Sequence, residues 1–166
     1  QHILRSGDEC KTWIEIADLA DFQTKAAFMD DIVTIKPHPA NPDIVFTLDK
    51  NHDLLKVVYD EGKKKASAES LNVFAALPEN MPADIVKDFN QIRTIAIDPE
   101  NTDVMYVSML APGIPNIYGT TDGGKTWKNI SEGLPFSGNA CIEVNRHTGQ
   151  LYRSSVIGTY KREGLR

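Results

Sequence analysis

The chain of 166 residues has the length of one domain or of a piece of a larger one, because typical domains run to about 100–200 residues. Its composition, 41% hydrophobic and 25% charged, is that of a packed globule and excludes a disordered or collagen-like chain. The formal net charge of −5 argues against general binding to nucleic acid or to anionic lipid, since both require a clustered basic field.

No apolar run approaches the roughly 20 residues of a membrane-spanning helix, so we expect no membrane insertion. The first residues carry no signal peptide, but the chain also lacks an initiator methionine and is therefore compatible with a mature or excised product. Cys10 and Cys141 lie far apart and have neither CxxC nor histidine partner spacing. We expect two free thiols and no zinc site.

The predicted elements follow an internal repeat of β-hairpins. Thr34–Phe46 and Thr94–Tyr106 match in register, and Ile142–Tyr152 is a copy shortened by one residue. In each copy the flanks are apolar or β-branched, and the centre is rich in Pro, Asn, Asp or Gly. Strand, turn, strand is the conformation that this pattern predicts.

A second motif, Ser/Thr-x-Asp-x-Gly-x-Thr-Trp, alternates with the hairpins. It is complete in Thr120–Trp127, the second box segment, while Ser6–Trp13, the first box segment, has Cys10 at the glycine position. A third, degraded copy lies at Asp60–Gly62. In such a segment the carboxylate accepts backbone N–H groups, glycine permits a positive φ, and tryptophan packs on the sheet. We predict this structural role for Ser6, Asp8, Thr12, Trp13, Thr120, Asp122, Gly124, Thr126 and Trp127.

The second motif resembles the Asp-box, or BNR repeat, of sialidases, xyloglucan-degrading glucanases, sortilin-type receptors and photosystem-assembly propellers. The resemblance implies an all-β fold of β-propeller blades, each of four antiparallel strands. The expected blades are 32–75 and 92–130, with partial blades at 1–17 and 141–166. About three blades form only a partial ring, so we expect further blades from the same longer chain or, as the alternative, a second copy.

As the resemblance implies, ligands of such proteins bind on the upper face, opposite the box turns. The upper loops here are 48–53, 108–116 and 154–157, and the connections between blades are 18–31, 77–91 and 131–139. The acidic pairs within those connections are expected to be solvated.

Among the upper loops, 48–53 has the highest proportion of side chains that can bind or react with a ligand. Two carboxylates, a histidine and an amide are groups that can bind sugar hydroxyls or serve as acid and base. The alternative is a plain turn between strands. The ligand-binding candidates are Asp49, Asn51, His52 and Asp53.

Other chemistry has little support in the sequence. His38 and His147 fall in hairpin turns, where we expect surface residues and no metal ligands. Neither a Ser-His-Asp order nor a phosphate-binding glycine loop occurs, and the arginines do not match the arginine trio of sialidases. No cofactor or metal is expected, and the catalytic residues stay unassigned.

Ile97–Tyr106 and Trp127–Pro135 resemble phrases of the large exported Asp-box proteins, such as xyloglucanases and sortilin ectodomains. This likeness implies a segment of a carbohydrate-active propeller, a glycoside hydrolase acting on polysaccharide or glycan. The alternative is a non-catalytic propeller that binds protein or glycan. Either class implies a carbohydrate or protein ligand and a secreted or exported protein, extracellular or periplasmic.

Overall fold

The computed structural model describes residues 2–18, 34–49, 52–79, 92–109, 116–134, 141–155 and 158–166. Several sequence predictions lie outside these residues: the acidic pairs Asp30–Asp31 and Asp84–Asp88, the candidate Asn51, and the apolar loop at 110–115.

The described residues form 13 strands in four sheets, and every neighbouring pair is antiparallel and consecutive in the chain. The first sheet holds β1 (His2–Arg5) and β2 (Ile14–Asp18). The second holds β3 (Lys36–Pro37), β4 (Ile44–Leu48), β5 (Leu54–Asp60) and β6 (Lys65–Ser70), and a 3-10 turn, η2 (Val73–Ala76), follows it. The third holds β7 (Ile92–Ile97), β8 (Met105–Met109), β9 (Ile117–Thr120) and β10 (Lys128–Asn129). The fourth holds β11 (Cys141–Val144), β12 (Leu151–Ser155) and β13 (Gly158–Arg162).

The repeated hairpins join the first two strands of the second, third and fourth sheets, and three aligned residues cap their turns. His38 Nδ1 accepts the N–H groups of the second and third residues after it over 3.1 and 3.0 Å. Asp98 Oδ1 accepts the N–H of Glu100 over 3.0 Å, and Asn145 Oδ1 accepts two N–H groups over 2.9 and 3.0 Å. Three different residue types thus supply the same acceptor at one turn position. His147 is exposed, whereas His38 is half-buried and stacks on Phe46.

The degraded copy of the box motif forms a different turn. The pairing of β5 with β6 continues to Asp60 and Lys65, so only four residues remain in the loop. Asp60 accepts the backbone N–H of Lys63 over 3.0 Å and pairs with its ammonium group over 2.8 Å. This hairpin therefore closes without threonine or tryptophan.

Three apolar layers hold the four sheets together, one between each consecutive pair. Between the first and second sheets the buried residues are Ile3, Ile16, Ala17, Val45, Leu55, Val57 and Tyr59. Between the second and third they are Phe46, Leu54, Leu71, Val73, Ile92, Ile95, Ile97, Met105, Val107, Met109, Tyr118 and Trp127. Between the third and fourth they are Ala96, Val104, Tyr106, Ile117, Ile130, Ile142, Val144 and Leu151. Each inner sheet is therefore buried on both faces.

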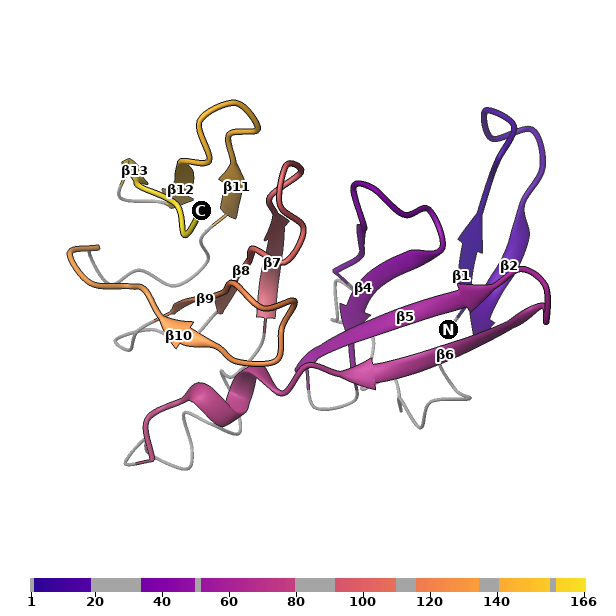
Figure 1. Cartoon of the computed structure of the whole chain (residues 1–166), viewed down its shortest axis with the longest axis horizontal. Coiled ribbons are helices and arrows are strands. Elements are labelled where there is room, and N and C mark those ends of the chain that lie inside the picture. The colour runs from indigo at the N-terminus through magenta and orange to yellow at the C-terminus, as the bar shows by residue number, and fades with distance from the viewer. Residues whose placement is uncertain are drawn as a thin grey trace.

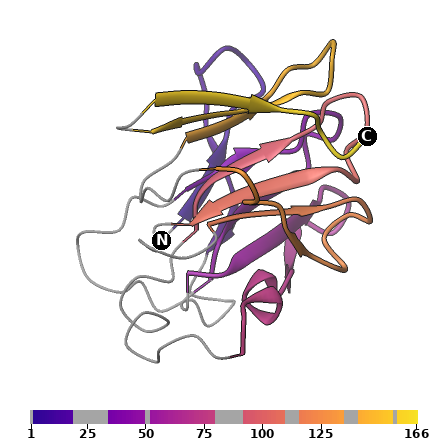
Figure 2. The same cartoon turned by 90° about the vertical axis from the view of Figure 1, so that its left-hand side faces the viewer.

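Figures 1 and 2 show the sheets stacked in chain order, from β1 and β2 to β11–β13. The first strands of the last three sheets, β3, β7 and β11, approach one another. The Thr34 hydroxyl donates to the carbonyl of Arg93 over 2.8 Å, and Lys36 pairs with Glu143 over 3.5 Å. An all-β stack of antiparallel sheets, two of them four-stranded in the described residues, with the first strands innermost, is a partial β-propeller. We call the space beside these three strands the inner channel.

Candidate functional site

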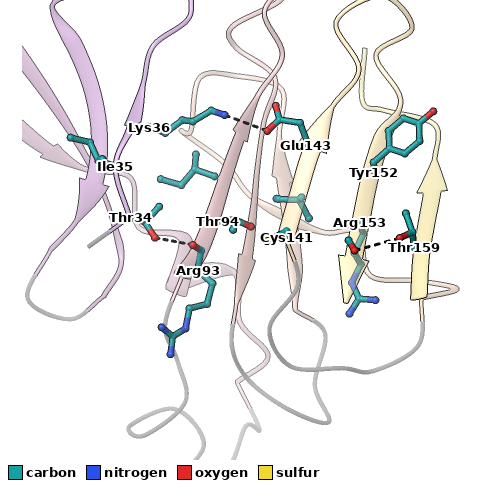
Figure 3. A pocket seen from close by; sticks show the side chains of 13 residues that line it. Thr34, Ile35, Lys36, Arg93, Thr94, Cys141, Glu143, Tyr152, Arg153 and Thr159 are labelled. Atoms are coloured by element: carbon teal, nitrogen blue, oxygen red, sulfur yellow. Dashed lines mark hydrogen bonds and ion pairs between the residues drawn. The ribbon is translucent and has the colours of Figure 1, made fainter. Parts of the chain in front are cut away.

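A pocket of about 400 Å³ opens in the inner channel. One side of the pocket is lined by β7, β11 and the start of β3 with the two residues before it. Strands β12 and β13 line the rest of the pocket (Figure 3). The hairpin repeat explains this convergence, because equivalent positions of three copies face one cavity. Those positions hold Thr34, Thr94 and Cys141, followed by Ile35, Ile95 and Ile142.

The charged side chains of this channel pocket are mostly cationic. Its described lining residues include Lys36, Arg93 and Arg153 and one carboxylate, that of Glu143. Figure 3 shows Arg93 and Arg153 extending toward the same end of the strands, the end at which β7 and β11 begin. Arg153 is only 2% exposed, and burial lowers the pKa of its guanidinium. The sheet therefore holds a largely desolvated cation at the pocket.

The loop predicted to bind ligand places one of its carboxylates in the core. Asp53 is buried and accepts the backbone N–H groups of Leu54, Val73 and Phe74 over 2.7, 3.0 and 3.3 Å. It therefore caps η2 from the preceding hairpin. Burial raises the pKa of Asp53, and the nearby Asp49 carboxylate raises it further. The three backbone N–H bonds lower this pKa, but the net effect is an increase.

A second described residue of this loop, His52, contacts β7 next to the channel pocket. Asp49 accepts the backbone N–H of Asp53 over 3.0 Å, and His52 has a positive φ of 62°. The carbonyl of His52 accepts the N–H of Ile92 over 3.4 Å, and Ile92 directly precedes the pocket residue Arg93. The structure thus brings this turn to the neighbourhood of the pocket, and its contact with a ligand stays a prediction.

The second box segment is fixed by its aspartate. Thr120 Oγ1 donates to Asp122 Oδ1 over 2.7 Å and accepts the backbone N–H of Gly124 over 3.1 Å. Asp122 also accepts the backbone N–H and the hydroxyl of Thr126 over 2.9 and 2.6 Å. The bond from the Thr126 hydroxyl is the largest cause that holds the pKa of Asp122 well below its ordinary range. Trp127 Nε1 donates across to the second sheet.

The first box segment has the same bonds. Asp8 accepts the Ser6 hydroxyl over 2.9 Å and the backbone N–H and hydroxyl of Thr12 over 2.9 and 2.7 Å, which lowers its pKa. Cys10 takes the place of Gly124, with a φ of 65° and its N–H on Ser6 Oγ over 2.9 Å. Trp13, by contrast with Trp127, is 56% exposed.

The sequence did not single out the residues that line the channel pocket. Arg93 and Arg153 follow no motif, and Tyr152 and Thr159 stand at ordinary strand positions. The position of Arg93 was the one signal in the sequence. Residues at the start of each innermost strand converge in a propeller, and Arg93 lies at the start of such a strand. Within the described ranges, no group of three His, Cys, Asp or Glu side chains is placed to hold a metal ion.

No protein-family model and no curated protein sequence matches the chain. Solved structures do match. The GH74 enzyme of Niastella koreensis superposes with a TM-score of 0.55 at 18% identity, over 96% of this chain and 25% of that one. An auxiliary nutrient binding protein of Bacteroides thetaiotaomicron gives a TM-score of 0.48 at 16% identity, over 81% of this chain and 30% of that one. YCF48 of Cyanidioschyzon merolae gives 0.42 at 14% identity, over 77% and 38%.

The first match agrees with the architecture described above, and at this identity it shows the fold alone. The chain is an all-β protein made of β-propeller blades, and it spans about a quarter of the length of the GH74 enzyme. None of the helices that the structure describes has the length and apolar character to cross a membrane.

Proposed function

We propose that the chain is a segment of an exported, carbohydrate-active β-propeller, a glycoside hydrolase of polysaccharide or glycan. In this proposal it supplies one wall of the sugar-binding site. The observation that carries the proposal is the channel pocket, in which three hairpin copies and the fourth sheet present hydroxyl, cationic and aromatic side chains to one cavity. The GH74 enzyme that the chain resembles in fold supports the choice of carbohydrate chemistry.

The described part of the pocket supports binding more directly than catalysis. Glycoside hydrolysis generally uses two carboxyl groups, about 5 to 10 Å apart. Glu143 is the one carboxylate among the described lining residues, and it pairs with Lys36. The buried carboxylate of Asp53 is occupied by three backbone N–H groups. In the proposed enzyme, therefore, a second carboxylate comes from outside the described lining, and Asp49 is the candidate within this chain.

The second candidate function is a non-catalytic propeller that binds glycan or protein through the same pocket. The single lining carboxylate favours this candidate. It predicts binding without turnover, whereas the first candidate predicts release of reducing ends.

A panel of soluble polysaccharides, with binding and reducing-end release measured together, tests both candidates. Hydrolysis that is lost in Asp49→Ala, with binding retained, supports the enzyme and assigns that upper-face carboxylate. Binding without hydrolysis supports the non-catalytic propeller. Asp53→Ala is unsuitable for this purpose, because loss of the cap would unfold the loop. If no polysaccharide of the panel binds, the carbohydrate proposal is wrong.

A further inference from the structure

The channel pocket has a charge opposite to that of the chain. The whole chain has a formal net charge of −5. Among the described lining residues, three side chains are cationic, Lys36, Arg93 and Arg153, and one is acidic, Glu143. A concave surface with walls of low dielectric concentrates such a field and attracts anions. The charge of the described lining is therefore opposite in sign to that of the chain as a whole.

The arrangement of the charges sets the arginines at the end of the pocket that lies away from the one ion pair of the described lining. Glu143 lies across the channel from Lys36, and the two groups are 3.5 Å apart. Figure 3 shows this pair at one end of the pocket and the guanidinium groups of Arg93 and Arg153 at the other. Arg93 is half-buried, and its Nε is buried and makes no hydrogen bond in the described part of the chain. Leaving a buried donor unused costs free energy that an anionic acceptor would recover.

On the exposed face of the fourth sheet, opposite to the face that holds Arg153, the lining carries groups suited to a sugar ring. Tyr152 presents a partly exposed aromatic ring, and the hydroxyls of Ser154 and Thr159 lie 3.4 Å apart on neighbouring strands. Aromatic faces pack on apolar surfaces, while hydroxyl groups donate and accept at the edges. Guanidinium, with its fork of N–H donors, is the side chain best matched to carboxylate and to other oxyanions.

We propose that the channel pocket binds an anionic glycan, whose carboxylate or sulfate group lies at Arg93 with Arg153 behind it. This inference deepens the proposed function and rests on it, since it names the class of glycan. A uronate carboxylate and a sulfate ester share the required chemistry. A neutral polysaccharide offers these arginines hydroxyl acceptors but no negative charge.

Titration calorimetry with three oligosaccharides of matched length tests the proposal: an oligogalacturonide, a sulfated carrageenan oligosaccharide and a neutral xyloglucan oligosaccharide. We expect at least one acidic ligand to bind about tenfold more tightly than the neutral one, and its affinity to fall with added salt. The acidic ligand that binds identifies the anionic group as carboxylate or sulfate.

Variants connect the binding to the pocket. Arg93→Gln is expected to weaken the acidic ligand about tenfold and to leave the neutral ligand unchanged, because a charge-assisted hydrogen bond is lost. Lys125→Gln is the matched control, since it removes one exposed positive charge that does not line the pocket. Arg153→Lys keeps the buried charge, and its thermal melt shows whether the sheet tolerates the change.

The outcomes separate the two proposals. Equal binding of neutral and acidic ligands, or an Arg93→Gln variant that binds the acidic ligand like the parent, overturns the anionic-glycan inference and leaves the carbohydrate function standing. If none of the three oligosaccharides binds, the anionic-glycan inference is wrong, and the polysaccharide panel decides the carbohydrate function. A fall in affinity that Lys125→Gln reproduces would also overturn the inference, because it would reflect net charge alone.

Discussion

At the scale of single residues, the aspartates of the two box segments act as local acceptors. Asp122 takes two side-chain bonds and one backbone bond within a turn of eight residues, Thr120–Trp127. Asp122→Asn removes the charge and leaves one amide N–H₂ facing a hydroxyl that formerly donated. We expect a fall of a few degrees in Tm, measured by circular dichroism. An unchanged Tm would mean that neither the charge nor the second carboxylate oxygen of Asp122 contributes to the stability of the turn.

The same carboxylates give stability a defined dependence on pH. The pKa values of Asp8 and Asp122 lie below the unfolded value of 3.8 in the folded protein. A depressed pKa contributes stability that is fully present above the unfolded pKa and is lost as pH falls toward the folded one. The free energies of unfolding in urea of the parent and of Asp122→Asn should therefore differ by a constant amount above about pH 5. The two free energies should converge as the pH falls below about 4. A difference that grows on acidification would contradict this assignment.

Cys10 occupies a backbone conformation that suits glycine. Its φ is 65° and that of Glu9 is 59°, whereas the second box segment has Gly123 and Gly124 at these positions. A side chain in the left-handed region costs about 1–2 kcal/mol, partly offset by the entropy that glycine loses on folding. Cys10→Gly should raise the free energy of unfolding by roughly 0.5 kcal/mol in urea. Cys10→Ser, which keeps the Cβ atom, should leave it unchanged and thus separates backbone strain from loss of the thiol.

At the scale of elements, one tryptophan links two sheets. Trp127 Nε1 donates to the carbonyl of Leu71, after β6, over 3.0 Å, and its side chain is only 9% exposed. Trp127→Phe keeps the apolar ring and deletes the donor, so a buried carbonyl of the second sheet loses a partner. We expect a cost of about 1–3 kcal/mol in urea unfolding.

Trp13→Phe is the matched control, because the same position of the first box segment is 56% exposed. Its cost should stay within about 0.5 kcal/mol. Equal costs at the two positions would show that the hydrogen bond between sheets contributes nothing beyond the box turn itself.

The elements differ in how far the sequence could predict them. The hairpins follow from local chemistry, since an alternating flank and a polar turn act within about a dozen residues. The acceptor role of His38, Asp98 and Asn145 in these turns came from the structure. The burial of Asp53 could not be predicted, because its partners Val73 and Phe74 lie about 20 residues further along the chain. The channel pocket depends on the rotation between sheets, which no local pattern encodes, so Arg93 and Arg153 looked like ordinary strand residues.

At the scale of the whole molecule, the two ends of the stack present different surfaces. The first sheet exposes three large apolar side chains, with Leu4 at 51%, Trp13 at 56% and Ile14 at 44%. On the fourth sheet the exposed strand positions are mostly polar: Cys141, Glu143, Tyr152, Ser154, Thr159 and Lys161. An exposed apolar face is stabilised by packing against another apolar face. The apolar first sheet and the polar fourth sheet are therefore not complementary. We therefore favour closure by further blades of a longer chain over a head-to-tail second copy.

The exposed apolar side chains of the first sheet lead to a prediction about self-association of the chain. In the second box segment, the equivalent tryptophan is covered by Leu71 of the preceding sheet, so the surface around Trp13 has the form of half an interface. The isolated chain should self-associate through this surface, and Trp13→Ser should remain monomeric at concentrations where the parent forms larger species in sedimentation velocity. Ile35→Ser removes an apolar side chain that is similarly exposed, at 51%, but lies in the channel pocket, and should associate like the parent. If the two variants behave alike, the association depends on general hydrophobicity and the first sheet has no specific docking face.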